Sequence, residues 1–442
     1  MKNVLLISAD FPYTYSQFAQ AYKRNGMTVL VIGGSPYYEL DQRLKESMDE
    51  YCWCGDMENI DNMINIVGYL ISKYGPIDYL ESNNEYWLRN DAILREHFNI
   101  TSGIWPAQLD EYQKKSSMKK FYKEAGVKTA PYILVDDLDS LISFAEKFGY
   151  PLFTKPDIGV GAAANYKLRN LDELKDFYAK KPKNVAYIVE PFIEGEVIQT
   201  FDGICDENSD VVIYDSMICP PSIYDIKELG QEMFYYVQKE VDPKFVAMGK
   251  KVIKVMGLKN RFFHGEFFIA KNSVKGYFKK GDVIGLEVNI RTPGGYTPDM
   301  INFGLSANIY QILADVVCFG KTDFVPGEHY FAATASRRNG QNYFFNDEDI
   351  WRTFRNNICF AGEYPFILSD IMGNKFYMAK FDNYEDMIVF KEYIERKANV
   401  SIAGSSNGMS HLVGEDKKIM AEKNTKSVKD DDTICDRHID GA

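Results

Sequence analysis

The sequence predicts an α/β region that opens the chain and an α+β region that follows it. Between residues 4 and 98, short apolar runs alternate with helical patterns, as in a parallel sheet. Residues 263–269 and 283–291 are rich in aromatic and β-branched residues and enclose a segment with Gly and Asp, which predicts an antiparallel hairpin. Strands and helices are also expected between these two regions and after them.

Length, charge and cysteine content restrict the class of protein. The 442 residues are enough for about two or three domains, and the net charge of −12 argues against nucleic acid as the main partner. The seven cysteines have no metal-binding spacing, which predicts reduced thiols and a cytoplasmic location. No apolar run is long enough for a membrane span, so no membrane partner is expected.

In the N-terminal part, each predicted strand is followed by a predicted helix. Strands are expected at residues 4–7, 29–34 and 77–80, and helices at residues 17–25, 61–73 and 85–98. Gly33 and Gly34 do not form a G-x-G-x-x-G fingerprint after the first strand, so a classical NAD site is not expected. Residues 104–106 are predicted to form a linker, and residues 110–125 a lysine-rich helix.

A loop rich in small residues follows the strand predicted at residues 151–155. This strand ends at Lys155, and the loop at residues 157–164 contains Gly and Ala, whose backbone N–H groups can approach a phosphate closely. The loop lacks the G-K-[ST] ending of a P-loop, and an ordinary tight loop is the alternative. Further elements are expected at residues 132–135, 138–148, 211–214, 243–256, 308–319 and 385–397, and residues 187–196 are predicted to form a strand that runs into a bend.

The predicted hairpin places polar side chains on apolar strands. Because strand side chains alternate between two faces, His264 and Glu266 share one face, and Glu287, Asn289 and Arg291 share one face of the partner strand. Buried carboxylates are rarely left unpaired, and oxygen ligands of this kind suit Mg²⁺ held partly by substrate phosphates. An arginine beside them suits a phosphate or a carboxylate. A solvated polar face is the alternative.

These parts, in this order, resemble the ATP-grasp superfamily over residues 1–320. The motif Glu-x-Asn-x-Arg at Glu287, Asn289 and Arg291 is the most specific part of the resemblance. The resemblance implies a Rossmann-like N-terminal domain and a two-lobed domain that binds ATP between antiparallel sheets. The implied divisions are an N-terminal domain at 1–105, a small lobe at 106–190, a large lobe at 191–325, a C-terminal α+β portion at 326–400 and a disordered tail at 401–442.

The resemblance also implies a role for each residue of the site. The residues implied to bind ATP are Lys115, Lys155, Gly159, Gly161, Ala162, Glu190, Phe192, Ile193 and Glu196. Glu266, Glu287 and Asn289 are the implied ligands of two Mg²⁺ ions, with Mn²⁺ as a possible substitute. Arg291, His264, Gly294 and Gly295 are the implied catalytic group. For His264 two roles stay open, contact with the reacting acyl group and orientation of Glu266.

The implied activity is an ATP-dependent carboxylate–amine ligase that forms an acyl phosphate and releases ADP and phosphate. The run from Arg291 to Gly295, Arg-Thr-Pro-Gly-Gly, is similar to that of ligases acting on amino acids and small carboxylic acids. The phosphate loop contains only two glycines, Gly159 and Gly161, whereas many members of the superfamily have more Gly and Ser in this loop. The alternatives are a carbamoyl- or carboxy-phosphate-forming ligase and a non-catalytic ATP-binding regulator. A homodimer is a possible assembly.

Overall fold

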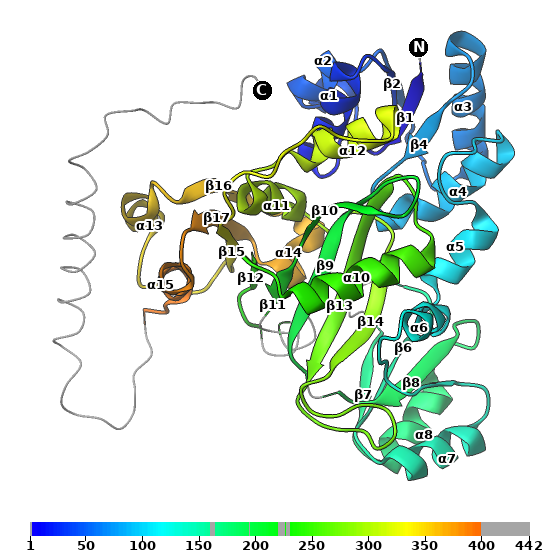
Figure 1. Ribbon diagram of the computed structural model, residues 1–442, viewed down its shortest axis with the longest axis vertical. Coiled ribbons are helices and arrows are strands. Elements are labelled where there is room, and N and C mark those ends of the chain that lie inside the picture. Colours follow the sequence, from blue (N-terminus) through cyan, green and yellow to red (C-terminus); the bar gives the residue numbers. More distant parts are fainter. Residues whose placement is uncertain (1, 160–163, 194, 220–225, 227–229, 399–442) are drawn as a thin grey trace.

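The computed structural model of this chain describes residues 2–159, 164–193, 195–219, 226 and 230–398. The side chain of Glu196 is outside this description. Three sheets organise these residues (Figure 1). A four-stranded sheet lies at the upper end, a nine-stranded sheet crosses the middle, and a second four-stranded sheet lies at the lower end. The predicted tail at residues 401–442 lies outside the described residues.

The N-terminal sheet is parallel and has the order β3-β2-β1-β4. Helix α1 packs on one face of this sheet through Phe18 and Tyr22, and α3 packs on the other through Met63 and Val67. Strand β1 is therefore buried throughout, as a doubly covered parallel strand should be. The elements are β1 (Asn3–Ile7), α1 (Ser16–Arg24), β2 (Thr28–Gly33), α2 (Gln42–Ser47), β3 (Glu50–Trp53), α3 (Ile60–Tyr74), β4 (Tyr79–Glu81), η3 (Glu85–Trp87) and α4 (Leu88–His97).

The predicted single helix at 110–125 is wrong, because the chain forms two consecutive helices there. Residues 104 and 105 of the predicted linker lie outside helices and strands, and its last residue begins the first of these helices. Helix α5 (Pro106–Gln113) begins with Pro106, whose fixed φ suits the first helical turn. Lys114 is extended at φ −76° and ψ 117°, and this breaks the helical pattern before α6 (Lys115–Glu124). The Ser116 N–H donates to Asp157 Oδ1 at 2.8 Å, which ties the start of α6 to the end of strand β6 (Leu152–Pro156).

The small lobe is an antiparallel sheet with two helices on one face. Its strand order is β5-β8-β6-β7, with β5 (Ile133–Leu134), β8 (Tyr187–Pro191) and β7 (Tyr166–Leu168). Helices α7 (Leu138–Phe148) and α8 (Leu171–Lys180) pack on Leu152 and Val189 through Leu141 and Leu174. The other face of this sheet borders the cavity described below.

The large sheet joins the predicted large lobe to the predicted C-terminal portion. Its order is β14-β13-β9-β11-β12-β15-β17-β16, with β10 paired to β9. The strands are β9 (Gly195–Cys205), β10 (Val211–Asp215), β11 (Met217–Cys219), β12 (Phe234–Val237), β13 (Arg261–Ala270), β14 (Val283–Asn289), β15 (Phe331–Arg337), β16 (Ile358–Glu363) and β17 (Lys375–Phe381). The predicted antiparallel hairpin is confirmed as β13 and β14.

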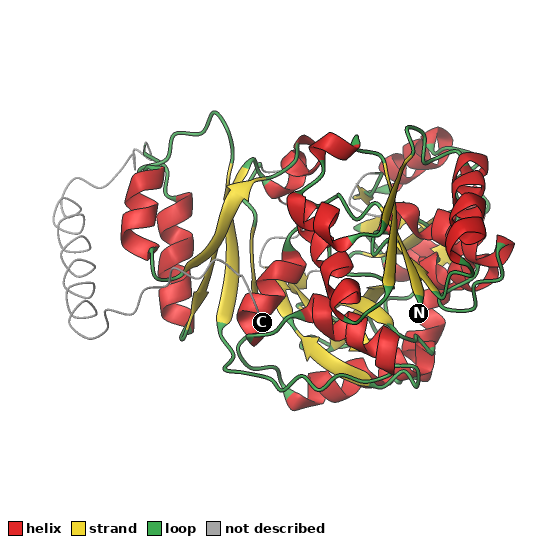
Figure 2. Cartoon of the chain, turned by 90° about the horizontal axis from the view of Figure 1, so that it is seen from above, coloured by secondary structure: helices red, strands yellow, loops and turns green. Residues whose placement is uncertain are grey.

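Helices cover the large sheet at both ends. Near β9 and β13, α10 (Pro243–Met256) packs through Phe245 and Val252. At the C-terminal strands, α13 (Asp347–Phe354) and α15 (Tyr384–Glu395) pack on one face, where Figure 2 shows helices stacked against strands. The other helices are α11 (Thr297–Leu305), α12 (Ile309–Phe319), η4 (Phe366–Leu368) and α14 (Ser369–Met372).

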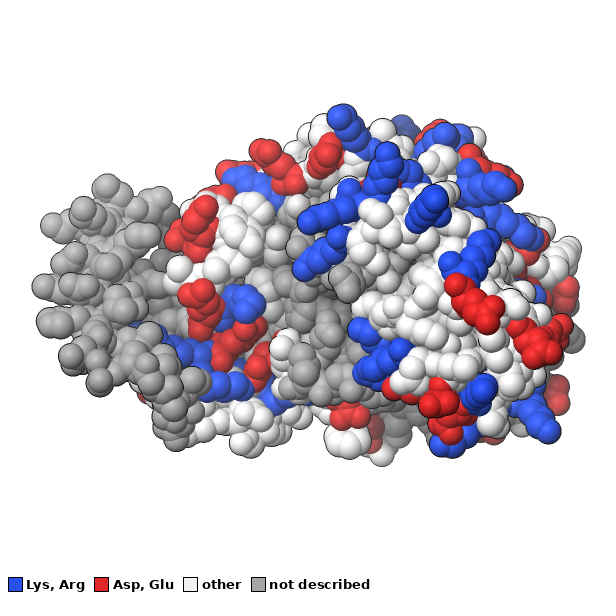
Figure 3. All heavy atoms as spheres, turned by 90° about the horizontal axis from the view of Figure 1, so that it is seen from below, with Lys and Arg blue, Asp and Glu red and all other residues white. Residues whose placement is uncertain are grey.

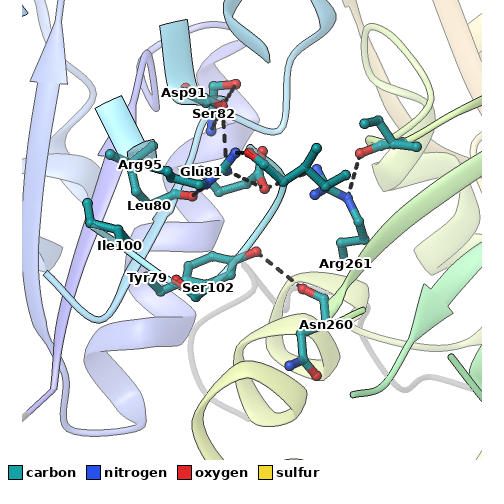
Figure 4. A network of polar contacts seen from close by, with 12 residues as sticks. Tyr79, Leu80, Glu81, Ser82, Asp91, Arg95, Ile100, Ser102, Asn260 and Arg261 are labelled. Carbon is teal, nitrogen blue, oxygen red and sulfur yellow. Dashed lines mark hydrogen bonds and ion pairs between the residues drawn. The ribbon is translucent and has the colours of Figure 1, made fainter. Parts of the chain in front are cut away.

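A buried ionic network joins the N-terminal sheet to the large sheet (Figure 4). Glu81, at the end of β4, accepts hydrogen bonds from Arg95 at 3.0 Å and from Arg261 at 3.1 Å. The side chains of these three residues are at most 3% exposed. Arg261 Nε also donates to the Ile290 carbonyl at 2.9 Å, just beyond β14. The network therefore sets where the end of the predicted hairpin lies relative to the N-terminal sheet.

Charged side chains of both signs share the lower face of the molecule. Figure 3 views this face, where Lys and Arg side chains gather among Asp and Glu side chains. The net charge of −12 therefore coexists with local groups of cations. Among the described helices, none alone is long and apolar enough to cross a membrane, although α11 and α12 pass that test together as a pair bent by 92°.

Candidate active site

A cavity of about 700 Å³ lies between the small lobe and the large sheet. Its walls bring together thirteen of the residues predicted for the site, from both hairpin strands, the start of α6 and the strands of the small lobe. These residues are Lys115, Lys155, Gly159, Glu190, Phe192, Ile193, His264, Glu266, Glu287, Asn289, Arg291, Gly294 and Gly295. Three predicted ATP-binding positions lie outside the description, namely Gly161, Ala162 and the side chain of Glu196.

The predicted metal ligands lie on adjacent strands. Glu266 of β13 and Glu287 of β14 are direct cross-strand partners, which places both carboxylates at the cavity wall. Asn289 Nδ2 lies 3.5 Å from Glu287 Oε1, and Lys115 Nζ lies 3.6 Å from Glu287 Oε2. Two carboxylates and one carboxamide are a suitable donor set for Mg²⁺.

The same donor set is too small to hold a cation alone. Within the part of the chain that the structure describes, no three His, Cys, Asp or Glu side chains form a metal-binding group. Mg²⁺ commonly binds through one or two carboxylates and completes its octahedron with water and substrate phosphates. The residues therefore fit Mg²⁺ that arrives with a nucleotide.

His264 bridges a buried aspartate and the predicted ligand Glu266. Its Nδ1 lies 2.5 Å from Asp202 Oδ1, and its Nε2 lies 3.1 Å from Glu266 Oε1. Burial would lower the pKa of His264, but the charge of Asp202 and hydrogen bonds to both carboxylates raise that pKa to about 10. The imidazolium in turn helps to lower the pKa of Glu266, against the effect of burial. This geometry favours the orientation of Glu266 over direct contact with an acyl group.

Two buried lysines flank Glu190. Lys155 Nζ lies 3.0 Å from Glu190 Oε2, and Lys119 forms an ion pair with Oε1 of the same carboxylate. Burial would raise the pKa of Glu190, but the two ammonium charges lower it to about 2. Burial lowers the pKa of Lys119, and Glu190 offsets that effect only in part. One carboxylate therefore faces two cations and leaves positive charge at the cavity wall.

Lys115 is held at the start of α6 by the loop that follows β6. Its Nζ donates to the Gly159 carbonyl at 2.7 Å, and its backbone N–H donates to the Asp157 carbonyl at 2.9 Å. The residue is only 8% exposed, so its charge is directed toward the cavity and not toward bulk water. A fixed, partly desolvated ammonium is well placed to bind phosphate.

Arg291 joins the hairpin end to the N-terminal domain. Its Nε donates to the Glu85 carboxylate at 3.1 Å, and its Nη1 donates to the Thr292 carbonyl at 2.6 Å. The Thr292 hydroxyl lies 2.6 Å from the Tyr15 hydroxyl. Strand β14 ends at Asn289, so the prediction that Arg291 lies on the strand is wrong, and these contacts place its side chain instead.

Three polar residues of the site were missed in the sequence. Lys119 lies four residues after Lys115 on the same helix, and that spacing was a usable signal. Asp202 is the cross-strand partner of His264, but β9 was not predicted, so its register was unknown. Glu85 lies in η3 after the N-terminal sheet, about two hundred residues before Arg291, and no local pattern indicates that contact.

Comparisons with known proteins agree with this geometry. No protein-family model matches the chain. An L-arginine-specific L-amino acid ligase from Bacillus subtilis is 23% identical over 319 residues, 70% of this chain and 74% of that protein. An alanine–anticapsin ligase from Bacillus subtilis strain 168 is 25% identical over 297 residues, 60% of this chain and 61% of that protein.

Among solved structures, an L-amino acid ligase from Bacillus licheniformis matches with a TM-score of 0.66 and 16% identity, covering 89% of this chain and 97% of that one. The chain has the ATP-grasp fold. The biotin carboxylase domain of a Hydrogenobacter thermophilus 2-oxoglutarate carboxylase, in complex with MgADP, ADP and bicarbonate, matches with a TM-score of 0.64 and 15% identity over 89% of each chain. The predicted fold class is confirmed, and the similarity to named ATP-grasp ligases supports an ADP-forming carbon–nitrogen ligase.

Proposed function

We propose that this chain is an ATP-dependent carboxylate–amine ligase that forms an amide or peptide bond through an acyl phosphate and releases ADP and phosphate. One observation carries the proposal. The facing carboxylates Glu266 and Glu287 share a cavity with the buried ammonium groups of Lys115 and Lys155 and with the guanidinium of Arg291. A nucleotide-phosphate subsite therefore lies beside a carboxylate subsite.

ATP would bind toward the small lobe. Lys115 and Lys155 present positive charge for its phosphates, and the segment at Glu190, Phe192 and Ile193 offers backbone groups and apolar surface for adenine. The Glu190 carboxylate itself is engaged by Lys119 and Lys155, so its contribution to nucleotide binding is to hold these lysines in place. We propose that Gly159, Gly161, Ala162 and Glu196 also bind ATP.

Glu266, Glu287 and Asn289 would hold Mg²⁺. We propose two ions, with Mn²⁺ as a substitute, because Glu287 lies between Asn289 and Glu266. When bound, the ions neutralise phosphate charge and align the γ-phosphate. The protein itself contributes by keeping the carboxylates oriented. His264 orients Glu266 in this way.

The acid substrate would bind at Arg291. A carboxylate oxygen attacks the γ-phosphorus of ATP, the bond from that phosphorus to the ADP oxygen breaks, and an acyl phosphate results. The amine nitrogen then attacks the acyl carbon and displaces phosphate, while the amine loses a proton to solvent or to the departing phosphate. Arg291 and the backbone N–H groups of Gly294 and Gly295 stabilise the developing oxyanion.

Two alternatives differ in what the site consumes. A carboxy- or carbamoyl-phosphate-forming ligase would use bicarbonate, which the biotin carboxylase neighbour was crystallised with. A non-catalytic regulator would bind ATP without turnover. The Arg-Thr-Pro-Gly-Gly run and the amino acid ligases among the relatives favour a larger organic acid.

The assembly, the location and the domain limits remain predictions. A homodimer is proposed because it is the commonest soluble assembly. A cytoplasmic location is proposed because the seven cysteines are scattered along the sequence without metal-binding spacing. The divisions at 1–105, 106–190, 191–325 and 326–400 are proposed as units, although β15 to β17 continue the large sheet through β12.

ADP release tests the proposal directly. The protein is incubated with Mg-ATP and a panel of carboxylic acids and amino acids, singly and in pairs, with Glu287→Ala as the blank. Release that requires both an acid and an amine and disappears in the blank supports the ligase. Release that requires bicarbonate in place of the acid favours the first alternative, and ATP binding without release favours the regulator.

A further inference from the structure

The cavity also has an apolar part that the proposed chemistry does not use. This part, which we call the apolar subsite, is lined by Ile198, Met217, Cys219, Met233, Tyr235 and Met372. We propose that the apolar subsite receives the side chain of the acid substrate, so that this substrate is an amino or carboxylic acid with a sizeable apolar side chain. The inference rests on the proposed function and names its substrate class.

The sheet register places the apolar subsite next to the catalytic row. On β13, Glu266 and Phe268 lie two residues apart and share a face. Glu266 is paired with Thr200 on β9, while Phe268 is paired with Ile198, and Ile198 is paired with Cys219 on β11. On this face of the sheet, Glu266 and Thr200 therefore form a polar row. The next row along the strands, formed by Phe268, Ile198 and Cys219, lacks charged side chains.

The segment that follows Arg291 leads to the apolar subsite, because Thr297 contacts Tyr235. Pro293, Gly294 and Gly295 line the same cavity as Arg291, and Thr297 follows them at the start of α11. The Thr297 hydroxyl lies 3.0 Å from the Tyr235 hydroxyl in a buried pair. The main polar groups in this part of the cavity are thus paired with each other, and a substrate held by its carboxylate at Arg291 can direct its side chain toward apolar surface.

The segment from η4 to α14 closes the apolar subsite from the other side. Leu368, Ile371 and Met372 line the cavity and pack against the main hydrophobic core. Neither these three residues nor the six of the apolar subsite carry a charge, so among the described residues of this part of the cavity a charged side chain would lose its hydration without gaining a counter-charge. An apolar side chain would instead gain from burial.

Sulfur-containing residues make the apolar subsite adaptable. Met217, Met233 and Met372 have flexible, polarisable side chains that can follow apolar groups of different shape. We therefore expect acceptance of several acids, such as leucine, methionine and phenylalanine, and not of a single one. Alanine should be a poorer substrate, because each missing methylene costs about tenfold or more in kcat/KM.

The experiment compares acids that differ only in side-chain polarity. ADP release is measured with leucine, methionine, phenylalanine, alanine, glutamate and arginine as the acid, at a fixed amine and with Glu287→Ala as the blank. The expected result is a kcat/KM for the apolar acids on the order of 100-fold above that for glutamate and arginine. Equal values, or a preference for the charged acids, would overturn the inference and leave the ligase assignment intact.

A charge placed in the apolar subsite should change the preference. In Met372→Glu we expect weaker use of leucine and stronger use of arginine, since the new carboxylate would pair with the guanidinium. Phe366→Glu is the matched control, because Phe366 lies in the same segment, is 93% exposed and is not part of the cavity wall. If both variants keep the wild-type order of substrates, Met372 does not face the substrate and the inference fails.

A binding measurement separates this inference from the proposed activity. Acid-dependent shifts in melting temperature are recorded with Mg²⁺ and a non-hydrolysable ATP analogue, so that no turnover is needed. A larger shift with phenylalanine than with glutamate supports the apolar subsite even if ADP release fails. Absence of release with every acid contradicts the ligase, whereas equal shifts with both acids contradict the apolar subsite.

Discussion

Arg291 Nε donates a hydrogen bond to the Glu85 carboxylate at 3.1 Å, so the N-terminal domain supplies a contact to the proposed carboxylate subsite. Glu85 begins the turn η3 that follows β4, whereas Arg291 follows β14 of the large sheet. The Thr292 hydroxyl donates to the Asn83 carbonyl at 3.1 Å and strengthens the same junction. The segment that follows β4 of the N-terminal sheet thus contacts the candidate site.

Glu85→Gln should raise the KM for the acid substrate by about tenfold, with little change in the KM for ATP. The reason is the loss of a charge-assisted hydrogen bond that orients Arg291, worth about 1.5–3 kcal/mol. Steady-state kinetics with each substrate varied in turn measure the two constants. Glu96→Gln, an exposed change in the same domain, is the control. A lower KM for the acid would instead mean that Glu85 competes with the substrate for Arg291.

His264→Gln should raise the Mg²⁺ concentration needed for half-maximal activity by about tenfold or more, with kcat largely kept at saturating Mg²⁺. His264 contacts Glu266, a proposed metal ligand, and loss of such an orienting contact costs about 10–100-fold in metal affinity. Activity is titrated against Mg²⁺ at fixed ATP, with Glu266→Gln as the stronger comparison. A fall in kcat of about 10²–10⁴ that Mg²⁺ does not restore would indicate acid–base catalysis by His264.

Glu190→Gln should reduce stability at neutral pH and flatten its dependence on acid pH. The folded pKa of about 2 lies below the ordinary 4.5, so the stabilisation is present above about pH 4.5 and is lost as the pH falls toward about 2. The difference of pKa corresponds to about 3 kcal/mol. The free energy of unfolding is measured from about pH 7 to about pH 3 for the wild type, Glu190→Gln and the exposed control Glu124→Gln. Parallel curves for the wild type and Glu190→Gln would contradict the ion pairs with Lys119 and Lys155.

Glu81→Gln should destabilise the chain by about 3–5 kcal/mol, because it removes the carboxylate that the buried Arg95 and Arg261 share and leaves Arg95 with only the more distant Asp91 at 4.0 Å. Denaturant unfolding followed by circular dichroism measures the change. Glu173→Gln is the control, since its ion pair with Arg169 has exposed fractions of 38% and 61% and should contribute at most about 1 kcal/mol. Equal effects of the two substitutions would show that the buried network does not hold the sheets together.

The sequence alone determined the features that depend on local spacing. The parallel opening, helix α10 (Pro243–Met256) and the hairpin of β13 and β14 follow from the periodicity of apolar residues, which reports on neighbours a few positions apart. The same alternation placed Glu266 and Glu287 on chosen faces of their strands. The resemblance to ATP-grasp ligases then located the cavity residues that the structure brings together.

Only the tertiary structure decided the contacts between distant segments. Strands β9, β11 and β12 are paired through the sheet, so the positions of Asp202 and of the apolar subsite depend on register and not on local pattern. The break at Lys114 arises where α6 is tied to Asp157. The ion pairs of Glu190 join β8 to the neighbouring strand β6 and to helix α6, and the bond from Arg291 to Glu85 joins the end of the hairpin to η3. Burial and long-range register set such contacts, and neither is a property of neighbouring residues in the chain.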